Sequence, residues 1–329
     1  MSSNPEPPVA CRRPLSPPND GDAFPQPVGA CSSMAAREVS IPPAASTAPR
    51  LFCSRRGRSK LLATACVLCL GGGLIALAEL RTSTGAASGR TLHGEGNLHG
   101  SRGPRPEGKT IRLATFNIQG GKGRDGRRDL DRTAETLKGF DIAGLNEVRG
   151  GSPWDPRDQA QLLGEKLGLA YLFAPGETRW WRGAYGNAVL SSLPARLWMR
   201  FPLPRARESS HRSVLWVEFE HRGRTIPVLI THTTPQPEEA QRSLVFEMFL
   251  SLDEPAILMG DFNARGDHPE ILRLLATAGV RGTAGESATG RKNGSLDWIF
   301  TRGLRWVESG VRDEGASDHD CHWVELDLD

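Results

Sequence analysis

The sequence Met259-Gly260-Asp261-Phe262-Asn263-Ala264 closes an apolar run that begins at Pro255. The run is short, rich in apolar residues and bounded by Pro and Gly, which is typical of a buried strand. Asp261 and Asn263 therefore stand where a strand ends. Alone, these two residues also fit an ordinary Asx-turn. A carboxylate and an amide at the end of a buried strand nevertheless indicate a polar site at the edge of a sheet.

The same arrangement recurs along the C-terminal two thirds of the chain. Strands and helices alternate in part, and strands also follow one another directly. This order favours a mixed-sheet α/β domain with two packed layers and helices outside. We predict strands at Ile111–Asn117, Asp141–Glu147, Asn187–Ser191, Ser213–Phe219, Thr225–His232, Pro255–Asp261, Leu296–Phe300 and His322–Leu328, and helices at Asp129–Lys138, Pro156–Leu167, Glu238–Leu250 and Pro269–Ala278.

The N-terminal third has a different composition. It is rich in Pro, Ala, Ser, Gly and Arg, and such a stretch buries too little apolar surface to offset the entropy of ordering it. We predict a disordered tail over 1–53, a signal segment over 54–81 with an apolar core at 61–78, a flexible linker over 82–109, and one globular domain over 110–329. Only Cys321 of the six cysteines lies in that domain, so no internal disulfide is expected there.

Two interpretations of the signal segment stay open. The charged flank Ser54–Lys60 before an 18-residue apolar run indicates a signal anchor with its N-terminus inside. Ser54-Arg55-Arg56 and the small-residue motif Ala76-Leu77-Ala78 indicate instead a cleaved twin-arginine export signal. Met34 is an alternative start of the chain. Either interpretation places residues 110–329 outside the cytoplasm, at the cell membrane or secreted.

The basic charge belongs to the tail and not to the predicted domain. Met1–Lys109 holds 13 Lys and Arg against 7 Asp and Glu, which leaves 28 basic and 31 acidic residues for the rest of the chain. The domain thus has a net charge of −3 and lacks the broad positive surface of a tight nucleic-acid binder. An enzyme that contacts nucleic acid briefly remains compatible with this charge.

The polar residues at the strand ends fit phosphodiester hydrolysis. Glu147 and Asp318 offer the carboxylates that a hard cation such as Mg²⁺ prefers, with Asn117 as a neutral oxygen ligand or a hydrogen-bond donor. A histidine oriented by a carboxylate can deprotonate a water, and His319 with Asp297 fits that requirement. The remaining donors suit the charge that develops on the phosphoryl oxygens; they are Asn187, His232 and Asn263.

The ordered motifs TFNI, NEV, YGNAVLSS, THT, GDFNA, LDWIF and SDH resemble the endonuclease/exonuclease/phosphatase superfamily over Ile111 to Leu328. The resemblance implies a four-layer α/β sandwich and dependence on Mg²⁺, or Mn²⁺. It assigns Asn117 and Glu147 to the metal site, Asp261 and Asn263 to the nucleophile and phosphate, Asp297 and His319 to a dyad, and Asp318 to a metal or water ligand. Two departures stand out: Asn146 replaces the usual Gln, and no Glu stands near Asn187 to partner His232.

Three functions remain as alternatives. The first is a nuclease, with Arg149, Asn187 and Arg212 binding the substrate. The second is the same chemistry on a phospholipid or inositol phosphate, as in a sphingomyelinase or an inositol-phosphate phosphatase, for which Trp180 and Trp181 are candidates for lipid contact. The third is a non-catalytic binding module tethered by residues 61–78. We expect a monomer without a protein partner.

Overall fold

The structure is a computed structural model that describes residues 81–90, 108–151, 156–179, 183–205, 210–235, 239–283 and 294–329. The predicted tail, the apolar segment 61–78, the pair Trp180–Trp181 and residues 91–107 lie outside these ranges. Within them, no helix combines the length and the apolar character that crossing a bilayer requires.

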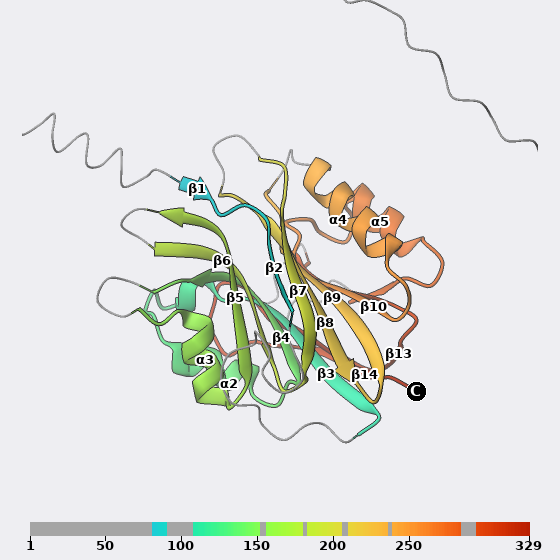
Figure 1. Ribbon diagram of the computed structural model, residues 1–329, viewed down its shortest axis with the longest axis horizontal. Helices are drawn as coiled ribbons and strands as arrows, with labels where there is room; N and C mark the ends of the chain where they lie inside the picture. The colour runs from blue at the N-terminus through green and yellow to red at the C-terminus, as the bar shows by residue number, and fades with distance from the viewer. Residues whose placement is uncertain are drawn as a thin grey trace, which may run out of the picture. The chain divides into compact units, whose positions relative to one another are not determined.

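Two mixed seven-stranded sheets form the body of the molecule (Figure 1). In each sheet one central pair is parallel, β3 with β4 and β9 with β10, and the neighbouring pairs are antiparallel. Sheet A has the order β1 (Arg81–Ser83), β5 (Ala170–Arg179), β6 (Gly183–Ser191), β4 (Ile142–Arg149), β3 (Thr110–Asn117), β14 (Cys321–Asp327), β13 (Arg305–Arg312). Sheet B has the order β11 (Arg281–Gly282), β12 (Asp297–Arg302), β10 (Ala256–Asp261), β9 (Arg224–His232), β8 (Ser213–His221), β7 (Ala195–Pro202), β2 (Ala87–Arg90).

Three apolar clusters separate four layers. The first joins the inner faces of the two sheets, for example Leu113 of β3 with Val228 of β9. The second packs α2 (Leu130–Leu137) and α3 (Gln159–Leu167) on the outer face of sheet A, and the third packs α4 (Glu239–Ser251) and α5 (Pro269–Leu275) on sheet B. Figure 1 shows these two helix pairs on opposite sides of the sheets. The predicted four-layer α/β sandwich is therefore confirmed.

Sequence periodicity explains why both faces of each sheet are covered. Along β3, Leu113 belongs to the cluster between the sheets, whereas Ala114 and Phe116 belong to the cluster under α2 and α3. Side chains alternate between faces along a strand, so a nearly continuous apolar run is buried on both sides. Every predicted strand and helix is present, with ends that shift by a few residues.

The predicted linker over 82–109 is wrong for its first residues. β1 pairs with β5 as the edge of sheet A, and β2 pairs with β7 as the edge of sheet B. The short connection between them is tied down by Arg200, whose Nε donates to the Gly85 carbonyl at 3.1 Å and whose Nη2 donates to the Thr84 carbonyl at 3.1 Å. Backbone pairing with two exposed sheet edges orders a segment that contributes little apolar surface.

Candidate active site

Strand register gathers the predicted residues at one edge of both sheets. In sheet A the parallel pair β3–β4 sets Asn117 beside Asn146. In sheet B, Asp261 at the end of β10 lies between His232, at the end of β9, and Asp297, at the start of β12. The chain reaches this point through Gly260, whose φ of 143° and contact with the Thr231 carbonyl leave no room for a Cβ.

Asn146 fastens the two sheet edges to each other. Its Nδ2 donates to Asn187 Oδ1 and to the Thr231 carbonyl, both at 2.9 Å, and its Oδ1 accepts from the Asp261 backbone N–H at 3.0 Å. Asn187 in turn donates to the Ser213 carbonyl at 2.9 Å. Buried amides that use their donors and acceptors in this way hold a scaffold in one geometry. Asn187, which we predicted to bind substrate, therefore also carries scaffold contacts.

Asn117 connects the carboxylates of the two sheets. Its Nδ2 donates to Asp261 Oδ2 at 3.0 Å and to Glu147 Oε1 at 3.2 Å, while its Oδ1 accepts from the Gln119 backbone N–H at 3.1 Å. The amide oxygen is thus occupied locally, and the NH₂ group faces the two acids. Of the two roles that the sequence left open for Asn117, this geometry favours the hydrogen-bond donor.

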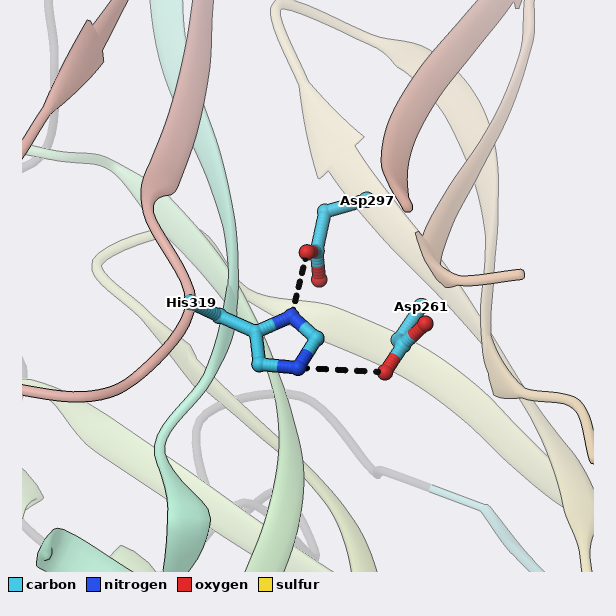
Figure 2. Close-up of side chains that lie close together, drawn as sticks. All are labelled: Asp261, Asp297 and His319. Carbon is cyan, nitrogen blue, oxygen red and sulfur yellow. Dashed lines mark hydrogen bonds and ion pairs between the residues drawn. The ribbon is translucent and has the colours of Figure 1, made fainter. Parts of the chain in front are cut away.

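His319 and Asp297 form the predicted dyad, as Figure 2 shows. Nδ1 of His319 lies 2.6 Å from Asp297 Oδ2, and Nε2 points toward Asp261 Oδ2 at 3.8 Å. Burial alone would lower the pKa of His319, but Asp297, joined by Asp261 and Asp318, raises it to about 10. Burial and the neighbouring Asp297 raise the pKa of Asp261 to about 6.

His232 reaches the same carboxylate from the other side. Its Nε2 lies 3.2 Å from Asp261 Oδ2, and its Nδ1 lies 2.8 Å from Nη1 of Arg212. Burial, with Arg212 and His319 nearby, holds the pKa of His232 well below its usual range. The sequence placed both residues in the site but did not pair them, because Arg212 precedes β8 and no spacing rule links it to the end of β9.

The loop before β14 brings Asp318 to the cluster. Ser317 Oγ donates to the Asn117 carbonyl at 2.7 Å, and Gln119 Nε2 donates to Asp318 Oδ2 at 2.9 Å. Gln119 and Ser317 are site neighbours that the sequence analysis missed. Gln119 follows directly on the polar end of β3, and Ser317 belongs to the SDH motif, so proximity to the motifs was the available signal.

Two further predicted residues lie at the rim of the site. Asn263 donates through its backbone N–H to Asp261 Oδ1 at 2.9 Å and through Nδ2 to the Thr233 carbonyl at 2.8 Å. The Arg149 side chain lies over Gly120, next to Gln119, so close that a Cβ on Gly120 would collide with it. Arg149 therefore borders the site.

Unusual backbone geometry is concentrated at this edge. In the described part of the chain four non-glycine residues have positive φ, and three of them belong to the site: Gln119 at 48°, Glu147 at 59° and Asn263 at 48°. Each such residue costs of order 1–3 kcal/mol, and such strain gathers where function fixes a side chain's direction. The fourth, Arg222, lies between β8 and β9.

The carboxylates fit a hard divalent cation. Glu147 is partly exposed, and among the described residues its hydrogen-bond partner is Asn117 and no lysine or arginine pairs with it. An oxygen ligand that no protein cation neutralises is what Mg²⁺ or Mn²⁺ requires. A second group of potential ligand atoms, from Asp261, Asp297 and His319, lies within 4.8 Å. There His319 Nδ1 already engages Asp297, so we regard Glu147 as the principal candidate ligand.

Comparisons with known proteins bear on the fold and on the family of the chain. No curated protein matches the chain. Solved structures of similar fold include an endonuclease/exonuclease/phosphatase from Beutenbergia cavernae DSM 12333, with 22% identity, a TM-score of 0.53, and coverage of 67% of this chain and 72% of that one. A family protein from Leptotrichia buccalis C-1013-b has 18% identity, a TM-score of 0.55, and coverage of 66% and 99%. The human Nocturnin catalytic domain has 18% identity, a TM-score of 0.52, and coverage of 66% and 94%.

These structural similarities, at low identity, support the fold. The sequence supplies the assignment, because the model of the Endonuclease/Exonuclease/phosphatase family matches residues 114–319, from the middle of β3 to the dyad histidine. The matched range includes all the residues that meet at Asp261. This chain belongs to the endonuclease/exonuclease/phosphatase family.

Proposed function

We propose that this protein is a divalent-metal-dependent phosphodiesterase that acts outside the cytoplasm, and that its substrate is nucleic acid. Phosphoesterase hydrolysis is the activity class of the family. The observation that carries the proposal is the arrangement around Asp261, which accepts from Asn117 and lies between two histidines beside Glu147. Such an arrangement can activate a water and stabilise a charged phosphoryl group in one place.

Each side chain has a role in this proposal. Glu147 and Asp318 would hold the cation, which when bound supplies Lewis-acid stabilisation of the developing charge. His319, oriented by Asp297, accepts the proton of the attacking water in its neutral form, which becomes populated as the pH rises toward its pKa of about 10. Asp261, held in part by His232, orients the water, and Asn263 donates to the phosphoryl oxygens.

Nucleic acid is favoured over lipid by the positive groups at the rim. Arg212 forms no ion pair with any carboxylate of the described chain, and Arg149 borders the same edge. The positive charge of both groups attracts the phosphates of a nucleic acid without reading its sequence, and Arg149 would contact them directly. The aromatic candidates for lipid contact, Trp180 and Trp181, lie outside the described residues.

Export is proposed from the sequence of residues 54–81. A positive flank before an apolar run directs the following domain across a membrane, whether or not the segment is later cleaved. A reporter fused after Asp329 tests this. Reporter activity restricted to the cytoplasm contradicts export.

A substrate comparison tests the activity. The full chain, with β1 and β2 retained because they complete both sheets, is assayed with Mg²⁺ or Mn²⁺ on plasmid DNA, sphingomyelin and phosphoinositides. We expect DNA cleavage that excess EDTA abolishes. Cleavage of only sphingomyelin or a phosphoinositide would contradict the nucleic-acid proposal and favour a lipid or inositol-phosphate substrate. Full activity in EDTA would remove the metal from the mechanism, and inactivity on all three substrates with folded protein would favour a binding module.

A further inference from the structure

Arg212 is held firmly by its backbone. The Leu203 N–H donates to the Arg212 carbonyl at 2.9 Å, and the preceding His211 N–H donates to the buried carboxylate of Glu177 at 2.8 Å. Gly176 of β5 lies against the His211 carbonyl, where a Cβ would collide at 2.7 Å. The chain before β8 is therefore clamped between β5 and the 203–205 segment, and this clamp aims the Arg212 side chain.

The hydrogen bond from Arg212 fixes how His232 is protonated. A guanidinium has only donors, so the 2.8 Å contact with Nδ1 requires a lone pair on that nitrogen. The proton of the neutral ring then lies on Nε2, which faces Asp261 Oδ2 at 3.2 Å. Flipping the ring would place C–H groups against both partners and lose both bonds.

A generic stabilising role explains this contact poorly. Nε of Arg212 is buried and has no hydrogen-bond partner among the described residues, and leaving such a group unpaired costs roughly 1–3 kcal/mol. His232 is the described side chain to which Arg212 donates. The sequence analysis found no Glu near Asn187 to partner His232, and the described partner of its Nδ1 carries a positive charge instead.

We infer that Arg212 is a positioning residue that locks His232 in the neutral Nε2–H tautomer, so that His232 serves only as a hydrogen-bond donor. With Asn117, His232 then donates to Oδ2 of Asp261, while the Asn263 N–H holds Oδ1. The carboxylate keeps one orientation for the attacking water. His232 neither takes a proton from water nor gives one to the leaving group.

The tautomer can be measured without a substrate. In the full chain labelled with ¹⁵N-histidine, His232 signals are assigned by their loss in His232→Gln. We expect a lone-pair signal for Nδ1 and a protonated signal for Nε2 in the wild type, and loss of this fixed pattern in Arg212→Met. His221 is an internal control, because its Nε2 faces the Gly108 carbonyl at 3.2 Å and should keep its signals. A protonated Nδ1 in the wild type overturns the inference.

The rate readout rests on the proposed function. If Arg212 acts through His232, Arg212→Met and His232→Gln lower kcat by a similar factor, about 10²–10³, and the double variant falls no further. Arg212→Lys retains a cationic donor and should recover the tautomer and part of kcat. Additive losses with a raised KM would assign Arg212 to substrate binding and overturn the inference. If no substrate is cleaved at all, the proposed function fails while the ¹⁵N signals still decide the tautomer.

Discussion

The two histidines of the site approach one carboxylate from opposite sides with partners of opposite charge. His319 is held by Asp297 at 2.6 Å, and His232 is held by Arg212 at 2.8 Å. Both rings direct Nε2 toward Asp261 Oδ2, at 3.8 Å and 3.2 Å respectively. The same residue type is thus placed twice around one acceptor, and the partner on Nδ1 is the difference between the two.

That partner sets the protonation of each ring. Burial acts on both histidines in the direction of a lower pKa, yet Asp297 and its neighbours raise the pKa of His319 to about 10, whereas Arg212 adds to the lowering at His232. One ring therefore favours the charged form and the other the neutral form. Pairs of titratable groups driven apart in this way are the usual source of distinct acid and base roles.

Removing the principal candidate metal ligand should abolish hydrolysis even though both histidines are intact. Glu147→Gln keeps the size of the side chain and an oxygen for the Asn117 donor but removes the negative charge that a hard cation needs. We expect hydrolysis to be abolished at ordinary Mg²⁺ concentrations, with an unchanged Tm. A variant that cleaves normally without added metal would show that Glu147 does not act through a bound cation. Catalysis would then rest on the two histidines and Asp261.

Removing each histidine in turn should give unequal losses. His319→Ala removes the proton acceptor and should lower the rate roughly 10²–10⁴-fold. His232→Gln removes one donor and should lower it about 10²–10³-fold, leaving the shape of the pH profile unchanged. Cys321→Ala, two residues from His319 in the core under α2 and α3, is the control with near-normal kcat. Identical rate losses with identical pH profiles would contradict the assignment of His319 as a proton acceptor and His232 as a hydrogen-bond donor.

Asp297→Asn should move the acid limb of the pH–rate profile. Below the pKa of His319 the ring is protonated and cannot accept a proton, so the rate rises as pH increases toward that pKa. Asp297 stabilises the protonated ring, and its neutralisation lowers this pKa and shifts the acid limb to lower pH. The measurement is kcat/KM against pH at saturating Mg²⁺. We expect the rate loss in Asp297→Asn to be similar to or smaller than that in His319→Ala. A wild-type limb near pH 6 would instead assign the proton acceptor to Asp261.

The sequence predicted site residues such as Asn117, His232 and Asp261 because they stand at the polar ends of apolar strands. Register does the rest: once β9 lies parallel to β10 and β12 antiparallel to it, His232, Asp261 and Asp297 must be neighbours. Pairings that depend on loops were beyond this logic. The sequence showed that no Glu stands near Asn187 to partner His232, but only the three-dimensional approach of residue 212 shows that a guanidinium lies at its Nδ1.

Strands with broken patterns were also missed. β5 contains Pro175 and Gly176, which signal a turn in isolation, yet it pairs along its length with β6. β13 is an edge strand whose polar residues conceal its pairing with β14. The strands β1 and β2 lack any apolar run, so the sequence did not predict them. They are ordered by cross-strand backbone hydrogen bonds and by Arg200. Composition alone cannot predict that a segment is ordered by pairing with strands that are distant in the sequence.

Arg200→Met should give the smallest effect and test whether stability alone can imitate the loss of a histidine. The variant retains an aliphatic chain in a largely buried position and removes two charge-assisted bonds to the Thr84 and Gly85 carbonyls. Because burying the guanidinium offsets part of their gain, we expect a loss of about 1–2 kcal/mol in the free energy of unfolding. Arg196→Met is the matched control on the same strand, since its side chain is 60% exposed and pairs with Glu218 at 3.9 Å.

Denaturant unfolding measures the stability difference, and kcat at 25 °C measures the consequence for the site. Arg200 ties the β1–β2 connection and touches neither histidine, so kcat should remain within about twofold of the wild type while the unfolding midpoint falls with an unchanged slope. If Arg200→Met instead lowers kcat as far as His232→Gln does, loosening the sheet edges is enough to disorder the site. The contrast between the two histidines would then reflect how firmly each is packed, and the charges of Asp297 and Arg212 would no longer be its cause.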